Sequence, residues 1–481
     1  MNWRGIQRLI GLLLGFYSLS FIPSLGLSIF YADGEAVHFA IASFITGMLG
    51  VVLWLPVRRD QSELRVRDGY FVVALFWAVL GVVGAIPFII GLHLDFTDAI
   101  FEAISGFTTT GATVIQGLDA LPPSILYHRQ QIQWLGGMGV IVLAVAILPL
   151  LGVGGMQLYR AETSGVTKDE KLSPRIMHTA QILWGIYFSL TVACALAYLA
   201  AGMDLFDAVG HAFATVSTAG FSTHDASIGH FDSLAVEAIC ITFMILGGIN
   251  FAIHFAVWQR RDPRRYLKDP EARAFLLILA ASGLFVGLSL FVAGAYLGLG
   301  ESLRRALFQV VSVMTTTGFG TADFSEWPRH VPFFLAMLAY VGGCAGSTAG
   351  GIKVVRVILL AKMGSRQMFA LAHPRATVLI RLGPRPVPEE VVYSVWGYYT
   401  LYLMVAVILT GGMMAAGLDL ESAFGATTAS LNLLGPGLGE VASSFATVNA
   451  PVKWLAIFAM LIGRLEVFTL LILFTYAFWR Q

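Results

Sequence analysis

The sequence predicts an all-α polytopic membrane protein, built from two N-terminal helices and four consecutive helix–loop–helix repeats. Its 481 residues are 57% hydrophobic and only 12% charged, whereas soluble domains average about 25% charged residues. Apolar runs of about twenty residues, the length of a membrane-spanning helix, recur along the chain. A short segment rich in glycine and hydroxyl side chains also recurs, with its central glycine at Gly111, Gly220, Gly318 and Gly435. Together these observations indicate one membrane domain made of repeated units.

The composition argues against other classes of protein. A formal net charge of +1 gives no basic footprint for nucleic acid. Cys194, Cys240 and Cys344 all fall in apolar segments, where we expect small core side chains rather than a disulfide framework. The N-terminus has Arg4 before an apolar run, as a signal peptide does, but no small-residue cleavage site ends that run. We therefore expect it to remain as a spanning helix.

The expected elements follow in order. The two N-terminal helices are predicted over residues 6–30 and 37–55, in a region that ends at residue 67. The repeats are predicted to occupy residues 68–158, 159–259, 260–366 and 367–481. Their first spanning helices are expected at 70–92, 176–201, 274–297 and 392–416, and their second at 131–151, 234–258, 331–363 and 452–478. Short amphipathic segments are expected between them at 97–108, 206–217, 303–315 and 422–432.

The short segments are expected to be re-entrant half-helices. About a dozen residues at 1.5 Å per residue cannot cross roughly 30 Å of hydrocarbon. Asp98 and Asp207 suit the start of such a helix, where an acidic side chain is favourable. Extended backbone after a half-helix is tolerated at membrane depth only if protein buries it or it lines a water-filled cavity. Length and composition therefore predict a cavity.

Basic residues predict the orientation. The basic clusters are at Arg4/Arg8, 58–67, 160–175, 260–273, 353–385 and Arg480. Ten spans place all of them on one face, which is then the cytoplasmic face together with both termini. The half-helices enter from the outside, where a minority of basic residues is expected: Arg129, Arg304, Arg305, Arg329 and Lys453.

The four stretches carry the predicted chemistry. The third reads Thr316-Thr317-Gly318-Phe319-Gly320, the pattern by which a potassium pore turns backbone carbonyls toward an ion. The predicted potassium-binding residues are Thr109, Thr110, Gly111, Thr218, Ala219, Gly220, Thr316, Thr317, Gly318, Leu434, Gly435 and Pro436. The hydroxyls of Thr109, Thr218 and Thr316 are candidates for a further ligand layer. An alternative is that the stretches are small-residue helix contacts of the GxxxG kind.

These stretches, with Gly435-Pro436-Gly437-Leu438-Gly439, resemble the TrkH/KtrB family of potassium-uptake proteins, and the two extra N-terminal helices resemble its TrkH branch. The resemblance implies a pseudo-fourfold, potassium-channel-like arrangement of four M1–P-loop–M2 repeats in each chain. It implies K⁺ as the transported ion with no organic cofactor, and a multi-pass protein of the bacterial cytoplasmic (inner) membrane. It also implies a homodimer and a cytosolic nucleotide-binding partner of the TrkA/KtrA type. Only the third stretch has the full pattern, and Leu433 replaces the threonine of the fourth, so fewer ordered ion sites are expected than in a homotetrameric channel.

A gate is predicted from two further features. The second helix of the third repeat contains Gly342, Gly343, Gly346, Gly350 and Gly351, and each glycine costs a helix about 1 kcal/mol relative to alanine. We expect a broken segment below the stretches, which the resemblance implies must move; close helix packing is the alternative. Lys353 and Arg356 after it are expected to anchor at the interface.

Arg464 lies in the last apolar run and is expected to face the cavity as an electrostatic barrier, or to form an ion pair with another helix. Glu466 need not be its partner.

The leading hypothesis is therefore potassium uptake through a gated pore. The alternative is an H⁺- or Na⁺-coupled potassium symporter, with sites at an inverted-repeat interface; the same orientation of the four repeats disfavours inversion. An enzyme is not expected, because no Ser/His, paired Asp or metal-ligating constellation is recognisable at membrane depth. His211 and His254 lack metal-ligand spacing and are expected to be packed, hydrogen-bonded side chains.

Overall fold

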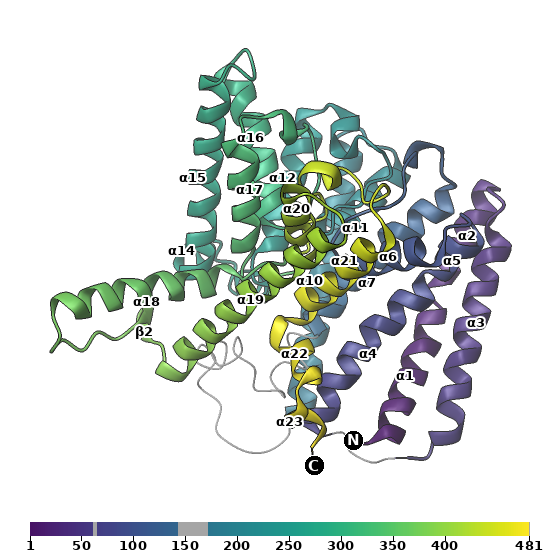
Figure 1. Cartoon of the computed structure of the whole chain (residues 1–481). Helices are drawn as coiled ribbons and strands as arrows, with labels where there is room; N and C mark the ends of the chain where they lie inside the picture. Colours follow the sequence, from purple (N-terminus) through teal and green to yellow (C-terminus); the bar gives the residue numbers. More distant parts are fainter. Residues whose placement is uncertain (61–64, 143–171, 481) are drawn as a thin grey trace.

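The computed structural model describes residues 1–60, 65–142 and 172–480, and this part is mostly helical, with loops between the helices (Figure 1). The strands within it form a two-stranded antiparallel hairpin, β1 (Arg381–Leu382) with β2 (Arg385–Pro386). The prediction of an all-α polytopic membrane protein is confirmed. The predicted boundary between the first two repeats, at residues 158 and 159, and most of the basic cluster 160–175 lie outside the described residues.

The N-terminal region forms α1 (Trp3–Ser18), α2 (Phe21–Tyr31) and α3 (Ala36–Trp54) at one side of the molecule (Figure 1). Helices α1 and α3 approach closely because Gly11 faces Gly50; an ideal Cβ on Gly11 would lie 2.9 Å from the Gly50 carbonyl oxygen. The outer side of α3 exposes Phe44, Met48 and Val52. An exposed apolar stripe along a helix of this length is what contact with lipid acyl chains requires.

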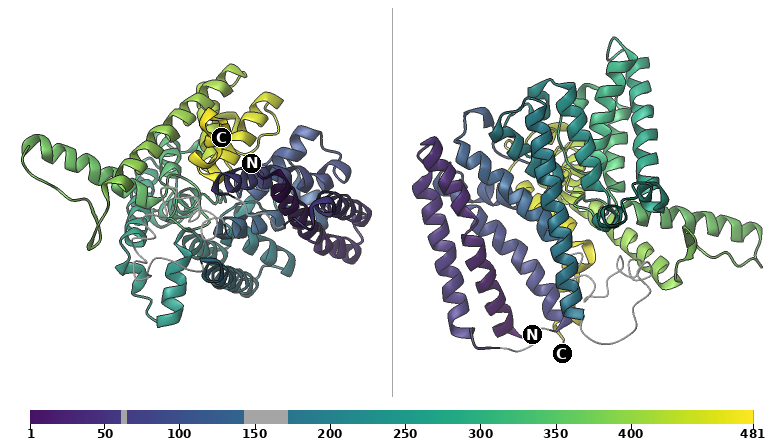
Figure 2. Two further views of the ribbon diagram at one scale, coloured as in Figure 1. Left: turned by 90° about the horizontal axis from the view of Figure 1, so that it is seen from below. Right: turned by 180° about the vertical axis from the view of Figure 1, so that it is seen from behind.

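Each repeat has the expected order of elements. The first spanning helices are α4 (Val66–Gly84) continued by α5 (Ile86–Ile90), α10 (Leu172–Ala200), α15 (Pro270–Val292) and α19 (Glu389–Ala415). The half-helices are α6 (Phe96–Phe107), α11 (Leu205–Val216), α16 (Leu299–Met314) and α20 (Leu420–Leu431). The second helices begin with α7 (Pro123–Val142), α12 (Leu234–Gly248), α17 (His330–Val341) and α21 (Ala450–Leu465). Seen from below, successive repeats follow one another around the middle of the molecule (Figure 2).

The ten expected spans are only partly reproduced as single helices. Among the described residues, six helices are long and apolar enough to cross a membrane, or up to eight if each of two bent pairs is one span. Helix α7 is described only to Val142, so the rest of the predicted span 131–151 lies outside the described residues. The predicted span 331–363 is replaced by the short α17, an irregular segment and α18 (Val354–Ala372), which projects from the body (Figure 1).

The second helices of three repeats break at equivalent positions. Helix α12 ends at Gly248 and α13 (Phe251–Arg260) leaves it at 100°, while α21 ends at Leu465 and the following helical segment, which starts at Val467, leaves it at 113°. In the third repeat α17 ends at Val341. The glycine-rich break was predicted only for the third repeat, so the breaks in the second and fourth were missed.

Three of the four half-helices begin with an aspartate cap, whereas α16 has Gly298 there without a side-chain cap. Asp95, Asp204 and Asp419 are the N-caps of α6, α11 and α20, and each side chain accepts a hydrogen bond from the backbone N–H three residues on. Asp98 and Asp207 lie in the first turns of α6 and α11, so the expectation that they suit the start of a half-helix is confirmed, although neither is the N-cap itself. Lys453 pairs with Asp98 at 2.6 Å.

Both termini lie at the same end of the molecule (Figures 1 and 2). Most of the basic residues expected on the opposite face are neutralised by acidic partners. Arg129 pairs with Glu102, Arg304 and Arg305 pair with Glu237, and Lys453 pairs with Asp98. These ion pairs explain how a minority of basic side chains is tolerated on the face opposite to the basic clusters.

Candidate functional site

The four glycine-containing stretches meet in a closed ring. Each motif glycine faces a backbone carbonyl of the next stretch, and the last faces the first. The distances from an ideal Cβ to that oxygen are 2.1 Å from Gly111 to Ala219, 1.9 Å from Gly220 to Thr317, 2.1 Å from Gly318 to Leu434 and 2.8 Å from Gly435 to Thr110. A side chain at any of these positions would collide with backbone. The ring therefore closes only around glycine.

All four stretches share one backbone conformation. Two residues of each are left-handed, and the residue between them is not. The left-handed pairs are Thr109 and Gly111, Thr218 and Gly220, Thr316 and Gly318, and Leu433 and Gly435, with φ between 51° and 94°. Such alternation turns successive carbonyls to one side of the chain. Leu433 adopts it although the threonine is missing, so the backbone repeat is stricter than the sequence repeat.

Hydrogen bonds fix the direction of the middle peptide in each stretch. The middle residue donates its N–H to a carbonyl five residues earlier, in its own half-helix, which leaves its carbonyl for the ring. These bonds are Thr110 to Ser105 (2.9 Å), Ala219 to Ala214 (2.9 Å), Thr317 to Ser312 (2.8 Å) and Leu434 to Ala429 (2.8 Å). Each half-helix ends immediately before its stretch, so four C-terminal partial negative charges also converge on the ring. The arrangement provides oxygens and a negative field for a cation.

The predicted ring residues differ in what their side chains do. The hydroxyls of Thr110 and Thr317 face away, toward Thr108 and Thr315 of their own half-helices, at 2.7 Å each. Pro436 lies against the third stretch, with its Cδ 2.8 Å from an ideal Cβ on Gly318. The threonine contacts tie the first and third stretches to their own half-helices, and Pro436 packs the fourth stretch against the third.

One carbonyl has a side-chain partner. Gln133 on α7 donates to the Ala219 carbonyl at 2.7 Å and accepts from the Phe221 N–H at 3.1 Å. The Ala219 carbonyl oxygen, which faces Gly111 in the ring, is thus also held by a side chain of α7. Gln130 of the same helix donates to the Phe221 carbonyl at 2.9 Å, so two buried amides hold the second stretch from behind.

The glycine-rich segment between α17 and α18, residues 342–353, lies directly against the ring. The Gly350 N–H donates to the Thr316 hydroxyl at 2.6 Å, and the Thr218 hydroxyl lies 3.0 Å from that of Thr348. An ideal Cβ on Gly350 would be 2.1 Å from the Asn432 carbonyl oxygen. The segment thus contacts the second and third stretches and the end of the fourth half-helix. The hydroxyls of Thr218 and Thr316, predicted as ion ligands, are engaged by this segment.

Arg464 joins the same segment to the first repeat. Its guanidinium donates to the carbonyls of Thr348, at 3.2 Å, and Gly136, at 2.9 Å. The side chain is buried, and its charged carbon lies 5.5 Å from the Trp77 ring centre. No acidic side chain among the described residues forms an ion pair with Arg464, so the predicted alternative of an ion pair is not observed there. Together with the glycine-rich segment, Arg464 contacts all four repeats.

Known proteins share this sequence and this fold. A family model described as "TrkH: Cation transport protein" matches residues 35–480. The chain therefore belongs to the TrkH family. It is 50% identical to the Trk system potassium uptake protein TrkH of Halomonas elongata and 49% identical to that of Escherichia coli K12, with both chains covered completely. It is also similar to the crystal structure of the potassium transporter TrkH from Vibrio parahaemolyticus, with a TM-score of 0.93, 47% identity and complete coverage of both chains.

In this TrkH-family chain, a buried ion pair that was not predicted as a site holds two stretches together. Arg129 donates to Glu102 at 2.8 Å, and both side chains are at most 1% exposed. Glu102 also accepts from the Thr113 hydroxyl at 3.0 Å, after the first stretch. Arg129 donates to the Ser222 carbonyl at 3.2 Å and lies over the Phe221 ring, 4.2 Å from its centre. The sequence signal was an acidic residue inside an apolar half-helix.

Further unpredicted acidic residues lie behind the glycine-rich segment. Glu271, in the first turn of α15, accepts from the Ala345 N–H at 2.7 Å and the Val355 N–H at 3.1 Å. Glu466 pairs with Arg356 at 2.6 Å. Arg356 is buried against the Tyr398 ring, so its predicted role as an interfacial anchor is wrong. These contacts fix both ends of the segment.

Small residues let the second helices of the TrkH fold approach the half-helix ends. An ideal Cβ would lie 2.0 Å from the Phe107 carbonyl oxygen for Gly136 and 2.2 Å from that of Leu431 for Gly463. Glycine at these two equivalent positions thus has a steric reason. His254 is hydrogen-bonded to Tyr266 at 2.7 Å and His211 to Ser222 at 2.9 Å, which confirms the expectation for both histidines.

Proposed function

We propose that the ring is a potassium-selective filter and that this chain takes up K⁺ across the bacterial cytoplasmic membrane. The observation that carries the proposal is the fourfold repetition of one backbone conformation, with equivalent carbonyls that each face the glycine of a neighbouring stretch around a closed ring. Carbonyl rings replace the hydration shell of K⁺. The printed names of the relatives, which are potassium uptake proteins, support the same ion. The transported K⁺ is cargo, and the proposal needs no organic cofactor.

The glycine-rich segment and Arg464 are proposed as the gate. The segment lies against the ring hydroxyls, and Arg464 brings a positive charge to the same place. A fixed cation on the path of another cation raises its free energy there. Opening requires the segment to leave Thr316 and Arg464 to release Thr348, which are a few hydrogen bonds worth about 0.5–3 kcal/mol each. A regulator can supply a free energy of this size.

The orientation and partners are further parts of the proposal. Both termini would face the cytoplasm, as the basic clusters favour. The projecting arm of α18 and the β1–β2 hairpin exposes Met368, Phe369 and Leu371. Exposed apolar side chains on an arm suit a protein contact, either in a homodimer or with a cytosolic nucleotide-binding subunit of the TrkA type.

The test is ion flux into liposomes that contain the purified chain. We expect Rb⁺ and K⁺ to enter faster than Na⁺, and Gly318→Ala to abolish this uptake. Left-handed backbone costs a side chain about 1–2 kcal/mol, and the new Cβ must also displace the Leu434 carbonyl. Gly300→Ala in α16 is the matched control, because nothing beyond its own chain neighbours and helix backbone lies within 4 Å of an ideal Cβ there. Equal uptake by wild type and Gly318→Ala would refute the filter.

The same liposomes test the gate and the alternative. Arg464→Ala is expected to raise Rb⁺ uptake at equal protein content; unchanged or lower uptake would contradict the barrier role. An H⁺- or Na⁺-coupled symporter is the second candidate. It would show uptake driven by a pH or Na⁺ gradient in the absence of a K⁺ gradient, whereas a pore would show none.

A further inference from the structure

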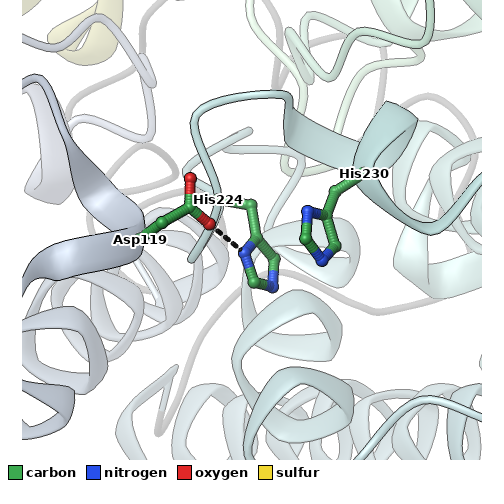
Figure 3. Close-up of side chains that lie close together, drawn as sticks. All are labelled: Asp119, His224 and His230. Carbon is green, nitrogen blue, oxygen red and sulfur yellow. Dashed lines mark hydrogen bonds and ion pairs between the residues drawn. The ribbon is translucent and has the colours of Figure 1, made fainter.

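Three side chains gather on the face where the half-helices begin, outside the ring. Asp119 lies on η2 (Leu118–Ala120), after the first stretch, and His230 on η4 (Ser227–Phe231), after the second. His224 lies in the loop before η4. Each of the three offers a ligand atom, and these atoms lie within 4.8 Å of one another. Figure 3 shows His224 turned toward Asp119, with the His230 ring beside it.

The two nitrogens of His224 face different carboxylates. Nδ1 lies 2.5 Å from Asp119, and Nε2 lies 3.0 Å from Asp207. Asp207 is itself held by the Thr223 hydroxyl at 2.6 Å. A histidine that ligates a metal usually donates its other ring N–H to a carboxylate, which fixes the tautomer and the ring orientation. Asp207 is placed to do this, and it leaves Nδ1 for a metal shared with Asp119.

We propose that Asp119, His224 and His230 form a binding site for a transition-metal dication of the Zn²⁺ class. Two imidazoles and one carboxylate are a ligand set that Zn²⁺ accepts, with water in the remaining position. The three residues come from two loops that belong to different repeats, so the metal ties the outer ends of the first two stretches together. The site is separate from the ring and does not depend on which ion the ring conducts.

Binding requires a local rearrangement that the exposure of the site permits. The rings of His224 and His230 are stacked with centres 3.6 Å apart and planes 1° apart, so their lone pairs run parallel instead of converging. His230 must rotate about its side-chain bonds. Its ring is exposed, and so is Asp119. The Asp119–His224 contact must also widen to about 3.3 Å, the separation of two ligands at about 2.0 Å from a tetrahedral ion.

The site is connected to the third stretch. The Gly229 N–H donates to the Gly320 carbonyl at 3.1 Å, and the Gly320 N–H donates to the Ser227 hydroxyl at 3.2 Å. Both partners belong to η4, which carries His230. Gly320 is two residues after the ring glycine Gly318. A metal that immobilises η4 thus acts on the backbone of the ring, and we expect it to change ion flux from the outside.

The first experiment measures binding and needs no transport. The full chain, purified without a histidine tag and stripped with a chelator, is titrated with Co²⁺ by visible absorption and with Zn²⁺ by calorimetry. We expect one ion per chain, and at least tenfold weaker binding in Asp119→Asn and His230→Ala. Asp207→Asn, which acts by positioning His224, is expected to weaken binding about 10–100-fold. His330→Ala, which removes another exposed histidine, is the matched control and should bind as the wild type does.

The outcomes separate the site from its effect. Absence of saturable binding at millimolar metal, or equal binding by all four variants, would overturn the site. The second experiment adds Zn²⁺ outside liposomes and measures Rb⁺ flux. A change of flux in the wild type and in His330→Ala, but not in His230→Ala, supports the connection through Gly320. Bound metal without a change of flux would overturn that connection. A failure of the proposed potassium function would appear as absent flux without metal, with binding intact.

Discussion

The buried pair of Arg129 and Glu102 is predicted to be strongly coupled. Arg129→Met leaves the Glu102 carboxylate, with 0% side-chain exposure, without its counter-charge, and Glu102→Gln leaves a guanidinium that is 1% exposed. Removing one partner of a buried ion pair costs about 3–5 kcal/mol, because the other charge stays buried and uncompensated. We expect each single variant to lose free energy of unfolding in this range. The double variant should lose less than the sum of the two, by at least about 2 kcal/mol.

The assay is a double-mutant cycle of unfolding in mixed micelles, followed by tryptophan fluorescence. Lys268→Met is the matched control, since its ion pair with Asp262 has 69% and 32% exposed side chains and exposed pairs contribute about 0–1 kcal/mol. Because the buried pair joins the loops after the first two stretches, both single variants should also lose selective Rb⁺ uptake. Single-variant costs below about 1 kcal/mol, or additive effects in the double variant, would refute the reasoning.

Three further predictions concern the supports of the ring and its gate. Asp204→Ala should destabilise α11 by about 0.5–2 kcal/mol through loss of its N-cap, seen as faster hydrogen exchange confined to that helix; unchanged exchange would contradict the capping role. Thr316→Val removes the acceptor of the Gly350 N–H and should raise Rb⁺ uptake, whereas lower uptake with an intact fold would count against the gate. Glu466→Gln removes the charge opposite buried Arg356 and should lower the free energy of unfolding by about 1.5–3 kcal/mol, with Glu389→Gln, at an exposed site, as the control that should change little.

Some features followed directly from the sequence because they depend on local properties. Apolar run lengths predicted the first spanning helix and the half-helix of each repeat to within a few residues, since burial of apolar surface and helix length are set along the chain; the second helices were predicted less well. The recurrence of Gly111, Gly220, Gly318 and Gly435 predicted a shared backbone. Glycine tolerates a left-handed φ, and it leaves room for a backbone oxygen about 2 Å from the position that a Cβ would occupy. The assignment of that backbone to potassium stays a prediction.

Other features depended on contacts between distant segments. The breaks after Gly248 and Leu465 arise where a second helix meets a half-helix end, which no run length reveals. The Arg129–Glu102 pair joins residues that are 27 apart in the sequence, and Arg464 donates to the carbonyl of Gly136, which is 328 residues away in the sequence. A charge in an apolar segment signals that some partner exists, but only the packed repeats decide which one. The same holds for Asp119 and His224, which lie 105 residues apart in the chain and meet because the first two repeats lie side by side around the ring.

The sequence alone determined that this is a membrane protein of repeated units, since hydrophobicity and glycine positions are local properties. The tertiary structure decided how charges and carbonyls are paired, since those pairings exist only once the repeats close on one another.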